Sequence, residues 1–170
     1  MKAVLPDLLA PSLSLLFCGT AASTTSAREQ AYYAKPGNKF WPTLHTVGIT
    51  PRRFLPHEFR ELLVLGMGFT DLCKTHSGTD AQLPPDAFDV RAFQAKLNIF
   101  SPRIVAFTSK RAGQTFFARP VAYGLQVAPA GVRAREMQFF VLPSPSGLAT
   151  RYFDVTYWRE LSTALNQRRE

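Results

Sequence analysis

The chain has 170 residues, 46% of them hydrophobic, which is the size and composition of one globular domain with a single core. Its two cysteines exclude both a disulfide framework and a four-cysteine metal or iron–sulfur site. The net charge of +8 falls mainly on residues 101–170, which carry ten basic and four acidic side chains, against ten and eight in residues 1–100. This uneven charge favours a polyanion partner, for which DNA or RNA is the usual choice.

The N-terminus resembles a lipoprotein signal peptide, because an apolar segment runs between Lys2 and Cys18. Pro6 and Pro11 interrupt that segment, so we interpret residues 12–18 as a buried strand instead. The sequence contains no run of about 18 apolar residues, which is the length that a membrane span needs. We therefore expect a cytoplasmic enzyme, associated with the nucleoid in a bacterium, with no membrane partner and a monomeric state.

Apolar runs and amphipathic segments alternate along the rest of the chain. Strands are expected over residues 12–18, 68–72, 104–108, 123–127 and 138–142. Helices are expected over residues 40–47, 56–65, 89–100, 110–117 and 153–165, with a helical turn or ordered loop over 24–31 and a loop over 74–87. This order predicts one domain over residues 1–170 with an α/β fold of three layers, in which helices flank a short central parallel sheet.

Ligands of such sheets bind beyond the carboxyl ends of the strands. Gly19, Asp71, Ser109 and Ser144 all fall at those ends, so these four regions predict the place of the site.

Two motifs near the N-terminus carry the chemistry. Residues 17–23, Phe-Cys-Gly-Thr-Ala-Ala-Ser, lead from a strand into a turn of small residues, which lets a ligand approach the backbone amides. Residues 32–42, Tyr-Tyr-Ala-Lys-Pro-Gly-Asn-Lys-Phe-Trp-Pro, gather aromatic rings around one asparagine and a Pro-Gly turn. Aromatic rings give a base a flat face on which to stack.

A third motif lies near the C-terminus, where residues 142–149 read Leu-Pro-Ser-Pro-Ser-Gly-Leu-Ala. With the first two motifs, it resembles the uracil-DNA glycosylase superfamily over nearly the whole chain. The sequence is most similar to the mismatch-specific uracil-DNA glycosylases and the DNA-deoxyinosine glycosylases. The resemblance implies the fold of that superfamily, which is a short parallel sheet between helices.

The catalytic residues that the resemblance implies are Asn38 and Asp71. The mismatch enzymes hold an asparagine that positions water where this chain has Ala21, whose methyl group cannot orient water. Asn38 matches the catalytic asparagine of the deoxyinosine enzymes and would orient water or hydrogen-bond the base, although it could also cap the next helix. Asp71 would act as a base toward water or stabilise an oxocarbenium-like sugar, or would only cap a loop.

The extruded base would be held by residues of the first two motifs. Tyr33 aligns with a phenylalanine that stacks on the base in the mismatch enzymes, and a place in the core is the alternative for this ring. For Phe40, which stands at a helix start, a place in the core is the more frequent role. The predicted base-binding residues are Gly19, Thr20, Ser23, Tyr33 and Phe40.

The third motif would contact the DNA itself. Its two serines would donate to phosphates, Leu148 would fill the space that the base leaves, and Arg151 would contact a phosphate. The alternative is an ordinary turn after a strand. The predicted DNA-binding residues are Ser144, Ser146, Gly147, Leu148, Ala149 and Arg151.

The function predicted by these motifs is that of a monofunctional DNA glycosylase, which flips a deaminated base and hydrolyses its N-glycosidic bond without a metal or another cofactor. Uracil is the first choice of base. Hypoxanthine is the second, because the small side chains of Ala21 and Ala22 would widen the pocket. Two alternatives stay open: a non-catalytic module that binds damaged or abasic DNA, and an enzyme acting on a small anionic nucleoside.

Overall fold

The computed structural model describes residues 2–130 and 137–167, which form a five-stranded sheet between two layers of helices. The strands are β1 (Leu15–Gly19), β2 (Met67–Asp71), β3 (Ile104–Phe107), β4 (Gly124–Gln126) and β5 (Gln138–Val141). The α-helices are α1 (Thr24–Glu29), α2 (Phe40–Thr46), α3 (Val90–Phe100), α4 (Lys110–Phe117) and α5 (Val155–Asn166). The 3-10 helices are η1 (Pro56–Leu63), η2 (Asp80–Gln82), η3 (Pro85–Ala87) and η4 (Gly147–Tyr152). The three-layer α/β fold is confirmed.

The strand order is β2-β1-β3-β5-β4, and the first four of these strands are parallel. β4 pairs antiparallel to β5, so the sheet is parallel except at this edge. The physical reason is the connection through residues 127–137, which is shorter than the crossover of roughly a dozen residues or more that a parallel pair needs.

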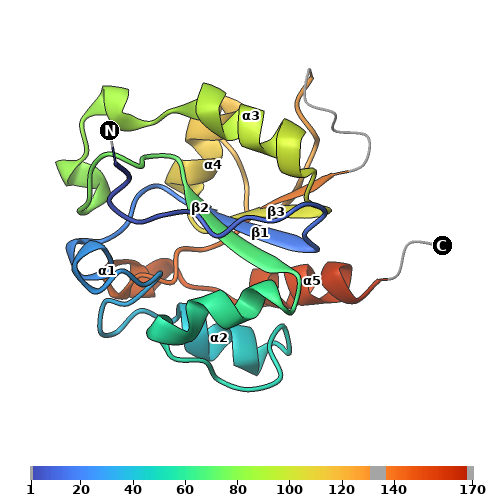
Figure 1. Ribbon diagram of the computed structural model, residues 1–170. Helices are drawn as coiled ribbons and strands as arrows, with labels where there is room; N and C mark the ends of the chain where they lie inside the picture. Colours follow the sequence, from blue (N-terminus) through green and yellow to red (C-terminus); the bar gives the residue numbers. More distant parts are fainter. Residues whose placement is uncertain (1, 131–136, 168–170) are drawn as a thin grey trace.

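The alternation of side chains along β1 divides the core in two. Leu15 and Phe17 pack with α2, η1 and α5, whereas Leu16 and Cys18 pack with α3 and α4 on the opposite face. Figure 1 shows this division, with α3 and α4 on one side of the sheet and α2 and α5 on the other. All five residues of β1 are buried, as a central parallel strand requires.

Two predicted elements differ in extent or type. The first strand begins at Leu15 rather than at residue 12, because Ser12 adopts a left-handed conformation with φ of 57° in a turn. The segment expected as an α-helix over 56–65 is the 3-10 helix η1. Phe59 and Leu62, its buried residues, are three positions apart and therefore lie on one face of a helix with three residues per turn.

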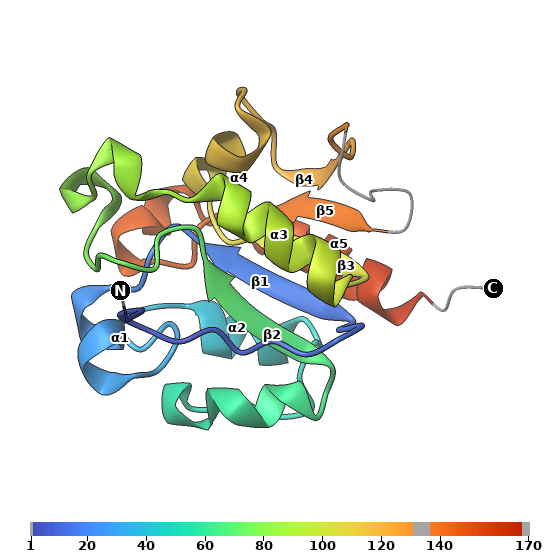
Figure 2. The ribbon, with the colours of Figure 1, turned by 45° about the horizontal axis from the view of Figure 1, so that its top comes forward.

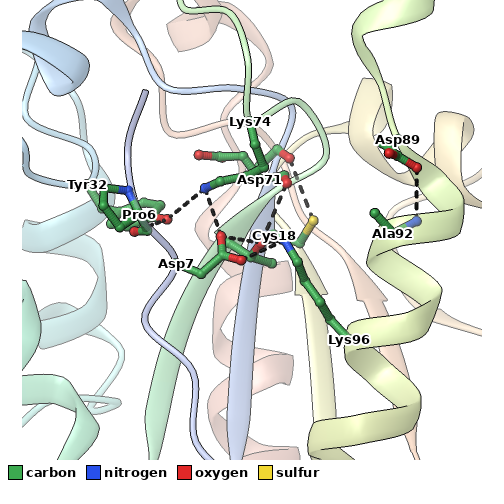
Figure 3. Close-up of polar contacts among 11 residues, drawn as sticks. Pro6, Asp7, Cys18, Tyr32, Asp71, Lys74, Asp89, Ala92 and Lys96 are labelled. Atoms are coloured by element: carbon green, nitrogen blue, oxygen red, sulfur yellow. Dashed lines mark hydrogen bonds and ion pairs between the residues drawn. The ribbon is translucent and has the colours of Figure 1, made fainter. Parts of the chain in front are cut away.

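The N-terminal segment runs along the outer edge of β2, as Figure 2 shows, and Leu8 forms an antiparallel bridge with Phe69. Asp7 fixes this segment through ion pairs with Lys74 (2.7 Å) and Lys96 (2.6 Å), drawn in Figure 3. The Thr70 hydroxyl donates to the same carboxylate at 2.8 Å. Burial acts to raise the pKa of Asp7, but the two lysines outweigh it and hold the pKa below its usual range.

Cys18 and Cys73 are buried free thiols. Burial raises the pKa of the Cys18 thiol well above its usual value, so this sulfur stays protonated and unreactive. Within the described ranges, no helix has the length and apolar character needed to cross a bilayer.

Replacing Asp7 with Asn should lower the free energy of unfolding by about 1–3 kcal/mol at neutral pH, because it leaves two partly buried lysines without their counter-charge. The pKa of Asp7 is lowered in the folded state, so this contribution is present above the unfolded pKa and disappears as the pH falls through the folded one. Urea denaturation near pH 7 and near pH 3 measures both.

Arg28→Ala is the matched control for Asp7→Asn. It removes the exposed ion pair with Glu29 and should change stability by less than about 0.5 kcal/mol. Equal losses in the two variants would show that the Asp7 cluster adds no more than a surface ion pair.

Candidate active site

A cavity of about 700 Å³ opens at the carboxyl end of the parallel strands. The register of the sheet puts Gly19 of β1 opposite Asp71 of β2, and Cys18 opposite Phe107 of β3. Residues of the turn after β1, of the loop after β3 and of the loop after β5 therefore line one space. In both Figure 1 and Figure 2, α1 and the short η4 lie beside each other at this end of the sheet.

Three polar side chains converge on Gly19 at the floor of the cavity. A methyl group built on Gly19 would come within 2.6 Å of an Asp71 carboxylate oxygen and within 3.4–3.5 Å of the hydroxyls of Thr108 and Tyr33. Only glycine leaves room for this arrangement. The same two hydroxyls are hydrogen-bonded to each other at 2.9 Å.

Asp71 is 5% exposed, yet it lines the cavity. Burial raises the pKa of its carboxyl to about 6, while the charges of Lys74 and Lys96 and the backbone amide of Gly19 pull the pKa down. Figure 3 shows Asp71 close to Lys74 and Cys18. A carboxylate with a pKa near 6 is ionised at neutral pH and is a stronger base than an ordinary aspartate.

Tyr33 lies at the cavity wall in a left-handed conformation with φ of 53°. One face of its ring stacks on Phe40 with centroids 3.9 Å apart, which leaves the other face to meet a ligand. Burial raises the pKa of its hydroxyl well above the usual value, so the phenol stays neutral. Phe40 itself is completely buried, so its predicted contact with the base was wrong: it supports Tyr33 from behind.

Asn38 lines the cavity and also caps a helix, so the two alternatives for this residue are compatible. Its side-chain oxygen accepts a hydrogen bond from the Phe40 backbone amide at 2.9 Å, at the start of α2. With the oxygen in this bond, the amide NH₂ group is the part of the side chain with two hydrogens to donate.

Thr20 and Ser23 line the cavity, but their hydroxyls already have partners. The Thr20 hydroxyl donates to Asp80 at 2.7 Å. The Ser23 hydroxyl caps α1, where it accepts from the Ser26 amide at 3.0 Å and donates to the Ser26 hydroxyl at 3.1 Å. Both oxygens keep acceptor capacity, so contact of these two side chains with a base stays a prediction.

The backbone of the first turn is held from one side. The carbonyls of Gly19, Thr20 and Ala22 accept hydrogen bonds from the amides of residues 72, 73 and 78. Within residues 2–130 and 137–167, the amides of Thr20 and Ala21 donate to no protein group. Backbone amides of this kind can bind the negative charge of a leaving group.

The loop after β5 forms the opposite wall, with Ser144, Ser146, Leu148 and Ala149 lining the cavity. Each serine oxygen accepts a backbone amide within this loop, which leaves its hydroxyl hydrogen free to turn toward a phosphate. The Pro145 carbonyl accepts from the Lys39 amide at 2.8 Å and ties the loop to the second motif.

The two remaining residues of the predicted DNA contact, Gly147 and Arg151, lie outside the lining. Gly147 approaches the backbone of Gly37, and Arg151 is exposed on η4. Leu148, the predicted wedge, is 72% exposed at the rim.

The chain matches the model of the family described as the Uracil DNA glycosylase superfamily over residues 6–165. It belongs to this superfamily. Its fold is similar to the solution NMR structure of a candidate uracil DNA glycosylase from Methanosarcina acetivorans, with a TM-score of 0.69 and 22% sequence identity over 98% of each chain. At that identity the similarity establishes the shared fold.

Members of the uracil DNA glycosylase superfamily are DNA N-glycosylases, whose reaction begins base excision repair, so membership gives this chain that enzyme class and DNA as its partner. In the part of the chain that the structure describes, no group of three or more His, Cys, Asp or Glu residues could hold a metal ion.

Several cavity residues were missed in the sequence. The sequence pattern predicts Thr108 only as the last residue of a strand, although a threonine at the carboxyl end of a central strand is the signal that identifies it as a cavity residue. The others lie just before a strand, on the first turn of a helix or at the end of a short helix, where nothing in the sequence shows that they face the cavity. They are Lys110, Arg111, Tyr123 and Tyr152.

Replacing Asp71 with Asn should raise the free energy of unfolding by about 1–3 kcal/mol near pH 8. The carboxyl binds its proton more tightly in the folded protein, so native stability falls as the pH rises from about 4 through 6. The variant lacks this penalty and should show no advantage below about pH 4. Urea denaturation across this pH range measures the difference, with exposed Asp86→Asn as the matched control. Equal stability of native protein and variant at pH 8 would contradict the raised pKa.

Proposed function

We propose that this protein excises uracil from DNA by hydrolysing the N-glycosidic bond, and that it leaves an abasic site. The observation that carries the proposal is the Asp71 carboxyl, with a pKa of about 6, on the floor of a cavity of about 700 Å³ whose wall includes the Tyr33 ring and the backbone of Thr20 and Ala21. A cavity of this volume accommodates a nucleotide that has left the helix.

Asp71 acts on the attacking water. Its carboxylate removes a proton as the water oxygen bonds to C1′ of the deoxyribose, and its negative charge stabilises the positive charge that develops on the sugar. The bond between C1′ and the base breaks, and the base leaves with the electron pair. The amides of Thr20 and Ala21 stabilise the resulting anion.

Tyr33 and Asn38 hold the base during this step. The free face of Tyr33 stacks on it, and the Asn38 NH₂ group donates to a carbonyl oxygen of its edge. Uracil supplies such a carbonyl and is the first candidate. Hypoxanthine also carries one, and Ala21 and Ala22 in the cavity wall leave room for a purine, which makes it the second.

The loop after β5 engages the DNA strand. The hydroxyls of Ser144 and Ser146 donate to phosphates beside the extruded nucleotide, and exposed Leu148 enters the stack in its place. Arg151, on the same short helix, contacts a further phosphate.

The decisive experiment uses end-labelled oligonucleotides with one uracil, single-stranded or opposite guanine or adenine, and a parallel set with hypoxanthine. We expect breaks at uracil only after alkali, because a monofunctional enzyme leaves the strand intact. The rate should fall as the pH drops below about 6, where Asp71 takes up a proton. Asp71→Asn should be at least about 100-fold slower.

Asp86→Asn is the control for this assay and should keep the native rate, since that carboxylate is exposed and outside the cavity. If the DNA stays intact in every set but still binds, the protein would be a damage-binding module and the proposed glycosylase activity would be rejected. Cleavage of hypoxanthine alone would change the substrate and keep the reaction.

Asn38→Asp separates base binding from helix capping. The aspartate keeps an oxygen for the Phe40 amide but has no NH₂ group to donate, and its charge opposes the leaving anion. We expect excision to fall by about 100-fold or more while the melting temperature stays near the native value. Asn38→Ala should lose both excision and some stability. A fully active Asn38→Asp variant would remove Asn38 from the chemistry.

A further inference from the structure

Tyr152 is a large aromatic residue that stands in solvent at the rim of the cavity. It is 68% exposed and ends η4, four residues after the proposed wedge Leu148. An exposed aromatic ring beside a binding cavity leaves apolar surface in water. Tyr152 has no role in the glycosylase reaction described above.

Two other tyrosines lie close to it. Tyr123 lines the same cavity just before β4, and its ring packs against Tyr157 of α5 with centroids 5.3 Å apart. Tyr152 lines the same cavity as Tyr123, so the Tyr123–Tyr157 pair and Tyr152 border one space.

Two basic side chains from the first turn of α4 face the same space. The Lys110 ammonium lies 4.5 Å from the centroid of the Tyr123 ring, and Arg111 lines the cavity beside it. Both are exposed at their positions on α4. We call Tyr123, Tyr152, Tyr157, Lys110 and Arg111 the tyrosine–lysine platform.

We propose that the tyrosine–lysine platform binds a nucleotide next to the extruded one, with its base stacked on Tyr152 and its phosphate at Lys110 and Arg111. The proposal rests on the proposed function and assigns its substrate class: single-stranded or locally opened DNA. The faces of paired bases are covered by their neighbours in a duplex, so only an unpaired base can stack on an exposed ring.

The charge of the platform and its continuity with the cavity favour nucleic acid over a protein partner. Its two cationic side chains, Lys110 and Arg111, match the phosphates of a strand. The ring of Tyr152 and the wall of the cavity that holds the extruded base belong to one continuous surface.

The test measures binding of a labelled single-stranded oligonucleotide of about 15 nucleotides with one uncleavable 2′-fluorodeoxyuridine. A tetrahydrofuran abasic residue replaces each neighbour of the uridine in turn, on either side. The native protein should lose about five- to hundredfold in affinity at one position, where the missing base was stacked. Tyr152→Ala should bind all these oligonucleotides with the same weakened affinity, whereas Tyr152→Phe should keep the native pattern.

Lys110→Ala is a second variant, which should weaken binding at every position and reduce its salt dependence. Its matched control is Arg60→Ala, which also removes an exposed cation lying 4.5 Å from an aromatic centroid, but on η1 across the sheet from α4. The Arg60 variant should bind within about twofold of the native protein.

The platform is refuted if the native protein shows no position dependence, or if Tyr152→Ala keeps it. Because the probe cannot be cleaved, this result is independent of catalysis. The expected pattern together with no excision of uracil would support the platform and overturn the proposed function. Excision of uracil without the pattern would do the reverse.

Discussion

The register of β1 with its two neighbours is the constraint on which the site depends. It places Gly19 opposite Asp71 on one side, and next to the residue that follows β3 on the other. Because the central position carries only a hydrogen, the carboxylate and the hydroxyls of Thr108 and Tyr33 can meet there. A shift of one residue along the strand would turn Cys18 toward this point and Gly19 away from it.

The second constraint is electrostatic. A carboxyl group held away from water at the end of β2 opposes folding when it is ionised. The N-terminal segment acts on this carboxyl in both directions. The charge of Asp7 raises the pKa of Asp71, whereas Lys74 and Lys96, which form ion pairs with Asp7, lower it. The stacked rings of Tyr33 and Phe40 add rigidity on the other side. Stability and basicity at the site are therefore set by the same few groups.

The sequence predicted the layers, the succession of strands and helices along the chain and the edge of the sheet where the motifs meet, because burial and periodicity are local properties. The sequence does not predict which partner a polar side chain binds, because that depends on tertiary contacts. Nothing in the sequence pattern shows that the Thr20 hydroxyl bonds to Asp80 or that Ser23 caps α1. It placed Phe40 against the base because its motif lies beside the site, whereas packing on Phe17 and Tyr33 buries the ring. The direction of β4 depended on the length of a connection rather than on the strand itself.

The course of the N-terminal segment also determines which edge of the sheet is open to another chain. Sheet edges expose unpaired backbone groups that can recruit a strand from another chain. Residues 4–8 cover the edge at β2, where the Leu8 carbonyl and amide both bond to Phe69. The opposite edge is β4, which is only three residues long. One edge is thus closed by the chain itself, and the other is too short to serve as a template for aggregation.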